Sequence, residues 1–227
     1  MSRSAFRIAV LALAGVSLLT LRSARADEAS STEEGKERAP SLFGIHRDNY
    51  FVVGSDGLEA KFQVSLRYRV HRNVFGLGNL YVAYTQKSFW DIGKESSPFR
   101  ESNYAPEVFF ELKERSYPDN WKLLTQAGFE HESNGRDGNL SRSWNRLFVE
   151  PRLSYRRPGA DHDLLALRLR IWGPLEVPDE NPDIERYYGY GEAGAVLRIE
   201  RVVIGLCGRI GSHFDRGNLR VDLAYRP

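Results

Sequence analysis

The sequence predicts an all-β protein, an antiparallel transmembrane β-barrel, from three observations. Segments of about ten residues alternate between apolar and polar side chains, and Gly, Asn, Asp and Pro turns separate them. The polar side of these segments carries several Arg, Glu and Gln residues, whereas the apolar side is long and ends in aromatic residues. An apolar outer band bordered by aromatic residues suits a lipid bilayer. After the N-terminal segment, the sequence never approaches the roughly 18 consecutive apolar residues of a membrane-spanning helix.

The first 26 residues have the three parts of a secretory signal peptide. Arg3 and Arg7 form a basic segment, residues 8–21 form an apolar segment, and Ala24 and Ala26 place small residues at the cleavage position. The signal holds four of the 32 Lys and Arg residues and none of the 30 acids, so the mature chain has 28 basic residues and a formal net charge of −2. That charge argues against a nucleic-acid-binding function.

Residues 27–47 are charged and poor in apolar residues, which predicts a disordered arm, and residues 48–227 are expected to form the barrel. Alternation is clearest in 61–70, 164–172 and 219–226, and a period of two places each apolar set on one face of a strand. The ten expected strands are 49–54, 59–71, 79–91, 103–114, 121–133, 144–156, 162–173, 185–199, 201–214 and 218–226. A soluble β-sandwich with one wet face also fits such alternation.

The candidate chemistry lies on two neighbouring strands joined by a loop at about 134–143. His131 and Ser133 share the apolar face of the first strand, Asn145 lies on the apolar face of the second, and an antiparallel hairpin brings Asn145 beside His131. Three polar groups on such a face cost free energy unless they satisfy one another. If Asn145 accepts from one imidazole nitrogen, the other can take the Ser133 proton, which makes Ser133 a nucleophile. Ordinary strand-end residues remain the alternative interpretation.

The residues around this constellation resemble a known family. Residues 131–136 read His-Glu-Ser-Asn-Gly-Arg and residues 141–146 read Ser-Arg-Ser-Trp-Asn-Arg, and both look like the signature of the outer membrane phospholipase A (detergent-resistant phospholipase A) family. Residues 84–88, 96–104 and 181–184 resemble further blocks of the same family, in family order. The resemblance covers most of the chain after the predicted arm.

The resemblance implies a twelve-stranded barrel in the outer membrane of a Gram-negative bacterium. It implies calcium-dependent hydrolysis of the acyl esters of glycerophospholipids and lysophospholipids, as a phospholipase A1 and A2. Carried onto this sequence, Ser133 is the nucleophile, His131 the general base and then acid, and Asn145 the residue that orients the histidine. The backbone amide of Gly135 would belong to the oxyanion hole.

The resemblance also implies a Ca²⁺ site and a homodimer. The matching oxygen ligands are the Arg136 carbonyl, the Ser141 hydroxyl and, from a partner subunit, Ser96. Glu180 matches a second calcium position, where the family has an aspartate. Gln86 interrupts the apolar face of its expected strand, and an amide in hydrocarbon is costly unless it is paired, so Gln86 is expected at the dimer interface.

The chain departs from the family pattern in its strand count. About ten strands are recognisable, and the sequence ends within the tenth, which predicts either a truncated barrel or closure with ten strands. Two competing functions follow. One is an inactive or truncated outer-membrane barrel with a structural or pore role, and the other is a soluble secreted esterase on a β-sandwich.

Overall fold

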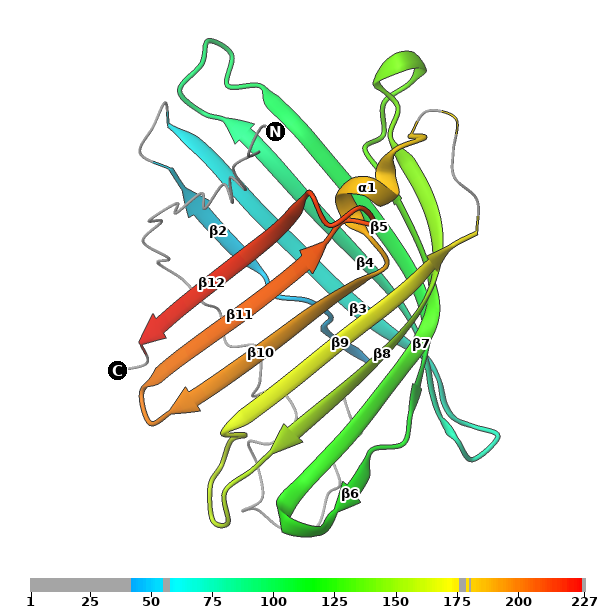
Figure 1. The fold of residues 1–227 in the computed structure, drawn as a ribbon, viewed down its shortest axis with the longest axis vertical. Helices are drawn as coiled ribbons and strands as arrows, with labels where there is room; N and C mark the ends of the chain where they lie inside the picture. The colour runs from blue at the N-terminus through cyan, green and yellow to red at the C-terminus, as the bar shows by residue number, and fades with distance from the viewer. Residues whose placement is uncertain (1–41, 55–57, 176–178, 180, 226–227) are drawn as a thin grey trace, which may run out of the picture.

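The computed structural model describes residues 42–54, 58–175, 179 and 181–225, which form a twelve-stranded antiparallel sheet (Figure 1). The predicted signal peptide and the predicted arm up to residue 41 lie outside the described residues. The strands are β1 (Phe43–Ile45), β2 (Tyr50–Val53), β3 (Glu59–Val74), β4 (Gly78–Asp91), β5 (Phe99–Leu112), β6 (Arg115–Tyr117), β7 (Trp121–Ser133), β8 (Ser143–Tyr155), β9 (Leu165–Pro174), β10 (Gly191–Ile199), β11 (Val202–Ile210) and β12 (Gly217–Tyr225). The described residues also form a helix, α1 (Ile184–Tyr188), and two 3-10 turns, η1 (Pro118–Asn120) and η2 (Gly138–Leu140).

Strands that follow one another in the sequence lie side by side in the sheet. The path runs β1-β3-β4-β5-β7-β8-β9-β10-β11-β12, with β2 also paired to β3 and β6 to β7. The sheet curls round, so that Arg220 on β12 forms an ion pair with Asp48, between β1 and β2, at 3.5 Å. The predicted antiparallel barrel is therefore confirmed. In the part of the chain that the structure describes, no helix is long and apolar enough to cross a membrane.

The two faces of the sheet are reversed relative to a water-soluble domain. On β8, the apolar side chains of Leu147 and Val149 are 53% and 49% exposed, while Arg146 and Glu150 beside them are 5% and 1% exposed. Large apolar side chains are also exposed on β3, β4, β5, β9, β10, β11 and β12, which would be unfavourable in water but suits contact with lipid. The buried polar side chains that recur along the inner face are Gln63, Ser65, Arg69, Glu107, Glu111, Gln126, Glu130, Arg146, Glu150 and Arg170.

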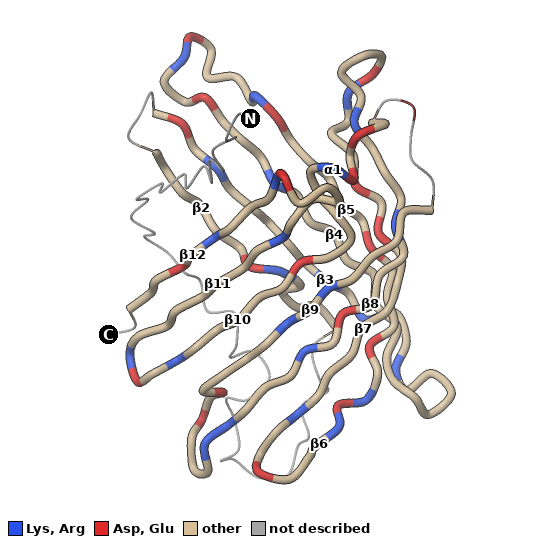
Figure 2. The backbone as a smooth tube through the Cα atoms, viewed as in Figure 1, with Lys and Arg blue, Asp and Glu red and all other residues tan. Residues whose placement is uncertain are grey.

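Charged residues of both signs recur along the strands (Figure 2), and several of them have buried side chains on the inner face. Glu150 accepts from Arg152 at 2.6 Å and from Arg170 at 3.1 Å, and Arg170 also donates to Glu107 at 2.9 Å. Because a buried charge without a partner is very costly, these pairs are a condition for filling the lumen with charged side chains. The interior is packed with ion pairs.

A charge placed on the outer face should destabilise the barrel. In Val149→Arg, we expect a loss of about 2–4 kcal/mol of stability, because a guanidinium near the bilayer midplane loses its water. The measurement is the urea midpoint of barrel unfolding in lipid vesicles, followed by heat-modifiable migration on SDS gels. The matched control is Asn139→Arg, which adds the same charge on the exposed turn η2. Equal midpoints for the two variants would contradict the assignment of faces.

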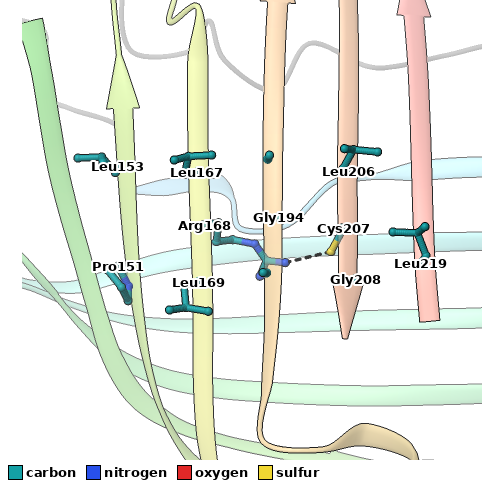
Figure 3. A pocket seen from close by; sticks show the side chains of 12 residues that line it. Pro151, Leu153, Leu167, Arg168, Leu169, Gly194, Leu206, Cys207, Gly208 and Leu219 are labelled. Atoms are coloured by element: carbon teal, nitrogen blue, oxygen red, sulfur yellow. Dashed lines mark hydrogen bonds between the residues drawn. The ribbon is translucent and has the colours of Figure 1, made fainter. Parts of the chain in front are cut away.

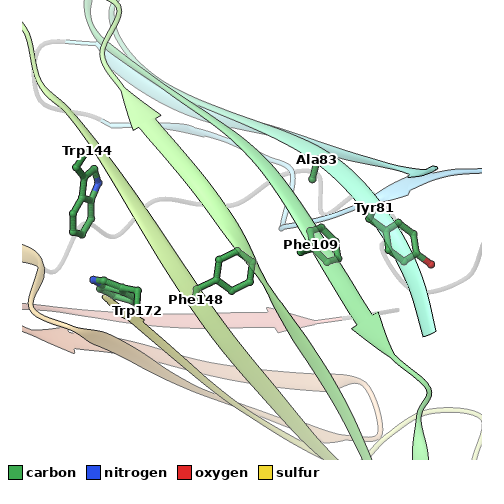
Figure 4. Packing of buried hydrophobic residues seen from close by; sticks show 6 residues of the cluster. All are labelled: Tyr81, Ala83, Phe109, Trp144, Phe148 and Trp172. Carbon is green, nitrogen blue, oxygen red and sulfur yellow. The ribbon is translucent and has the colours of Figure 1, made fainter. Parts of the chain in front are cut away.

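An aromatic cluster runs along the inner face, from the rim beside α1 toward the other end of the strands (Figure 4). The six buried side chains of this cluster are Tyr81, Ala83, Phe109, Trp144, Phe148 and Trp172. Ile184 and Tyr188 of α1 pack against this cluster, and the Trp172 indole donates to the Gly189 carbonyl at 2.9 Å. The helix is therefore tied to the inside of the barrel wall.

Beyond the strands, α1 is also tied to the turn between β11 and β12. Arg186 Nε donates to Asp215 Oδ2 at 3.1 Å, and this hydrogen bond holds the pKa of the Asp215 carboxyl below its usual range. Ser212 N donates to the Glu185 carbonyl at 3.0 Å. The helix and this turn form one rim structure.

The ten predicted strands are present, but some of their bounds differ. Residues 184–188 form α1 where a strand from 185 was expected, because a spacing of four places Ile184 and Tyr188 together on the aromatic cluster. Gly189, at φ +62, then ends the helix before β10. The predicted arm 27–47 is wrong at its end: β1 pairs with β3, and the Phe43 ring contacts Tyr68 at 4.8 Å.

An apolar groove of about 560 Å³ lies along β8 to β12 (Figure 3). It forms where the small side chains of Ala193 and Ala195 leave space between Leu167 and Leu206 on the neighbouring strands. On β8, the lining residue that lies nearest to Asn145 in the sequence is Pro151, six residues away, which is about 20 Å along a strand. The groove therefore contains none of the predicted site residues.

Candidate active site

A histidine and an asparagine face each other across two neighbouring strands. The register of β7 and β8 places His131 directly opposite Asn145, and His131 Nδ1 lies 2.8 Å from Asn145 Oδ1. Because an amide oxygen only accepts, Nδ1 carries the proton and donates it, which leaves the Nε2 lone pair for another group. The predicted pairing of these two side chains is confirmed.

Ser133 lies on the same outer face, two residues beyond His131. At the rise of a β-strand, their Cα atoms are about 7 Å apart, a spacing at which a hydroxyl and an imidazole on one face can meet. Across the sheet, Ser133 pairs with Tyr104 of β5 on one side and with Ser143 of β8 on the other. His131 and Ser133 near the end of β7, and Asn145 near the start of β8, are all half-buried. The structure thus places the predicted serine, histidine and asparagine on one face of two paired strands.

The turn after Ser133 requires glycine at position 135. Gly135 has φ +66, and a Cβ there would come within 2.9 Å of the Tyr104 ring. Asn134 fixes the rest of the loop: its side-chain nitrogen donates to the Leu140 carbonyl at 2.8 Å, and its side-chain oxygen accepts from the Arg142 amide at 3.0 Å. The backbone beside Ser133 is therefore held in one conformation.

The predicted calcium ligands occupy two loops at the same end of the sheet. Arg136 and Ser141 lie in the loop between β7 and β8, and Ser96 lies in the exposed turn between β4 and β5 at φ +62. The loop between β7 and β8 is tied to the start of β5, just after the turn that holds Ser96, because the Arg136 guanidinium donates to the Arg100 carbonyl. Glu180 lies outside the described residues.

The donor chemistry of this rim fits a hard cation. A backbone carbonyl and a hydroxyl are oxygen ligands of the kind Ca²⁺ prefers, but Ca²⁺ takes six to eight of them. The described residues contain no group of three or more His, Cys, Asp and Glu side chains that could hold a metal. A site built on Arg136 and Ser141 therefore needs further oxygens, from water or from a second subunit.

Gln86 lies on the outer face of β4, as predicted, but it is not without partners. Its amide nitrogen donates to the Ser88 hydroxyl at 3.2 Å, and its oxygen accepts from the Tyr84 hydroxyl at 3.4 Å. Among the described residues, these two bonds use half of the four that a glutamine amide can make. The register pairs Gln86 with Tyr104, which in turn pairs with Ser133. Gln86 and Ser133 thus share one cross-strand row, two strands or about 10 Å apart.

The sequence did not reveal the residues that hold the site from behind. Asn181, beyond β9, is buried and donates to the Ser143 carbonyl at 3.2 Å, which ties a later loop to the start of β8. On the inner face, Arg146 binds both Glu130 and Glu132. The alternation predicts that these three side chains face inward, but it does not predict which of them touch.

The chain matches the family model described as Phospholipase A1 over residues 21–227. It is 35% identical over 171 residues to the phospholipase A1 of Salmonella typhimurium, which covers 74% of this chain and 57% of the relative. The phospholipase A1 of Escherichia coli K12 is 34% identical over the same share of each chain. The chain thus spans about 57% of the length of these curated relatives.

Solved structures agree with this family. The outer membrane phospholipase A of Escherichia coli matches with a TM-score of 0.67 and 31% identity, over 74% of this chain and 66% of that one. The dimer of the Salmonella typhi outer membrane phospholipase, with bound calcium, matches with a TM-score of 0.67 and 32% identity, over 74% and 65%. An active-site mutant of the Escherichia coli protein, in which an asparagine is replaced by alanine, matches with a TM-score of 0.64.

These neighbours are Gram-negative outer-membrane proteins, and the outward-facing apolar side chains of this chain suit the same membrane. The matched segment includes the whole strand pair that carries His131, Ser133 and Asn145. The chain belongs to the phospholipase A1 family.

Proposed function

We propose that this chain hydrolyses the acyl esters of glycerophospholipids and lysophospholipids in the outer membrane, with both A1 and A2 specificity, and that it depends on calcium. The observation that carries the proposal is the 2.8 Å hydrogen bond between His131 and Asn145, on the outer wall beside Ser133. A site that faces lipid meets its substrate without extracting it from the bilayer. The calcium-bound neighbour and the asparagine active-site mutant support the same reading.

The proposed mechanism uses the three side chains in sequence. Ser133 Oγ attacks the ester carbonyl carbon while His131 Nε2 takes the hydroxyl proton, which leaves an acyl-enzyme after the alcohol departs with that proton. A water molecule then attacks the acyl group, and His131 again takes and returns the proton. Asn145 accepts from Nδ1–H throughout and so keeps Nε2 as the reacting nitrogen, without adding a negative charge.

The oxyanion of the tetrahedral intermediate needs donors aimed at it. The Gly135 backbone amide is the proposed donor, since it follows Ser133 closely in a turn whose φ of +66 glycine adopts without strain. The Arg136 carbonyl, the Ser141 hydroxyl, the partner's Ser96 and, at a second position, Glu180 would hold calcium. When bound there, Ca²⁺ supplies positive charge near the developing oxyanion.

Fatty-acid release from mixed micelles of detergent and phosphatidylcholine tests this proposal. With wild-type protein we expect release in millimolar Ca²⁺ and a loss of at least about 10²-fold with a chelator, as when one oxyanion donor is removed. Mg²⁺ at the same concentration is the control, since it prefers rigid octahedral coordination. Release that is unchanged by the chelator would remove the calcium role. No release under any condition would leave the inactive barrel as the function.

A homodimer with Gln86 at its interface is part of the proposal. Gln86 lies in the same cross-strand row as Ser133, so a second barrel docked on Gln86 would also cover the site. Such a contact would bring the partner's Ser96 to the rim and exclude lipid and water from the reacting ester. Dimer formation and calcium binding would then support each other.

Replacing Gln86 by alanine should weaken the dimer modestly. Polar pairs inside membranes contribute about 0.6 kcal/mol on average and up to about 2 kcal/mol. We therefore expect the dissociation constant of the dimer to rise by about threefold to about thirtyfold. The measurement is chemical crosslinking in micelles across a dilution series, with calcium present. The control is Val82→Ala, on the same outer face of β4. Identical dilution curves for Gln86→Ala and wild type would remove this residue from the interface.

A further inference from the structure

We infer that Arg146 is a positioning residue for the His131–Asn145 pair, acting from the lumen side of the wall. The inference rests on the proposed function, since it assigns a role in holding the proposed site. Arg146 follows Asn145 directly in β8, but its side chain points to the opposite face. It does not touch the reacting atoms.

The guanidinium of Arg146 grips both neighbours of His131 in the sequence. Nη2 donates to Glu130 Oε1 at 2.6 Å and to Glu132 Oε2 at 2.8 Å, and Nε donates to Glu130 Oε2 at 3.2 Å. The register pairs Glu130 with Arg146 and His131 with Asn145 as consecutive rungs. The Arg146 guanidinium on β8, next to Asn145, therefore binds the two β7 residues that flank His131.

This clamp is buried and strongly held. Glu130 is fully buried, and it also binds Arg170 and lies 3.2 Å from a guanidinium nitrogen of Arg47. Arg170 reaches further to Glu107. Three cations thus surround one buried carboxylate, so Glu130 cannot shift without leaving charges uncompensated in the lumen. These ion pairs hold in place the Glu130–Arg146 pair, which neighbours the His131–Asn145 pair in the two strands.

Aromatic rings hold the other side of the guanidinium. Arg146 lies over the Trp144 ring at 4.2 Å and the Trp172 ring at 5.1 Å. Trp144, on the other side of Asn145 in the sequence, is buried and packs against Tyr188 of α1, with ring centroids 5.3 Å apart. Both sequence neighbours of Asn145 are therefore anchored in the lumen, while Asn145 itself faces outward.

The placement matters because the chemistry depends on small distances. A misplacement of about 1 Å in a catalytic geometry can cost about 10²-fold in rate. Lysine at position 146 would keep the charge but lose the planar fork that binds both carboxylates at once. A residue that only stabilised the barrel would change the amount of folded protein and not the turnover of each folded molecule.

The test is a double-mutant cycle between Arg146→Lys and Asn145→Ala, with kcat and KM measured per heat-modifiable, folded protein in micelles with Ca²⁺. Alone, Arg146→Lys should lower kcat by about 10-fold or more and change KM by less than about twofold. In the Asn145→Ala background, it should lower kcat by less than about twofold, because the pair that it positions is already broken. An equal fold-loss in both backgrounds, or no loss alone, would overturn the inference.

A matched control separates position from general lumen charge. Arg168→Lys makes the same change at a lumen ion pair with Glu150 and Glu192, away from the site, and should leave kcat unchanged. A loss at Arg168 equal to that at Arg146 would overturn the inference. If Arg146→Lys does not fold, Glu132→Gln is the second variant, because it weakens the ion pair of Arg146 with the more exposed of its two carboxylates. It should lower kcat alone and not in the Asn145→Ala background, and additivity there would also overturn the inference.

The proposed function has its own separate outcome. If wild-type protein releases fatty acid and Ser133→Ala releases as much, the Ser-His-Asn mechanism fails, whatever the cycle shows. If hydrolysis depends on Ser133 but the cycle is additive, only the role of Arg146 fails.

Discussion

Replacing Ser133 by alanine is expected to lower fatty-acid release by about 10⁴-fold or more, because removing the nucleophile leaves only binding and oxyanion stabilisation. The barrel should remain intact, since Ser133 is half-buried at a strand end and its backbone pairing with Ser143 is kept. The measurement is kcat on phosphatidylcholine micelles with Ca²⁺, normalised to folded protein.

Ser143→Ala is the matched control for this prediction. Ser143 lies opposite Ser133 in the next strand, on the same outer face, and loses the same hydroxyl. Its variant should keep nearly full activity, because no histidine lies two residues away on its strand. If Ser143→Ala is inactive and Ser133→Ala is active, the nucleophile has been assigned to the wrong strand.

Replacing His131 by alanine should be nearly as damaging as replacing Ser133. The serine hydroxyl is a weak nucleophile unless a base takes its proton, so removing the base should cost about 10⁴-fold or more in kcat. The double variant Ser133→Ala, His131→Ala should be no slower than the single Ser133 variant, since the two residues act as one unit.

His162→Ala is a suitable control for the histidine prediction, because His162 lies in the β8–β9 loop with its hydrogen bond to Asp161. It should retain wild-type kcat. If the double variant loses the product of the two single losses, then Ser133 and His131 act independently and the proton-transfer scheme is wrong.

The long strands could be predicted because one face of each meets lipid and the other meets the lumen. That difference in surroundings gives the sequence an alternation of apolar and polar residues. In β3, for example, Val64 and Leu66 alternate with Gln63 and Ser65. The three-residue strands β1 and β6 are too short to show a period. The helix α1 was missed for a related reason, since its five residues carry a helical spacing that has meaning only beside the aromatic cluster.

The outward-facing part of the site could be predicted for the same reason as the strands. His131 and Asn145 are polar where the period demands apolar residues, and the hairpin places them together. The support from the lumen could not be predicted in this way. Glu130, Glu132 and Arg146 are polar on a polar face, so their identity stands out only once the distances between their side-chain atoms are known.

Covalent labelling with a long-chain fluorophosphonate, followed by peptide mass spectrometry, detects an activated serine. With the full chain in micelles and Ca²⁺ present, we expect a single adduct on Ser133, formed much more slowly in His131→Ala, since the hydroxyl must lose its proton to attack phosphorus. The signal should not depend on which phospholipid the enzyme prefers. An adduct on another serine, or equal labelling of Ser133 with and without His131, would contradict a His131-activated Ser133 on the outer wall.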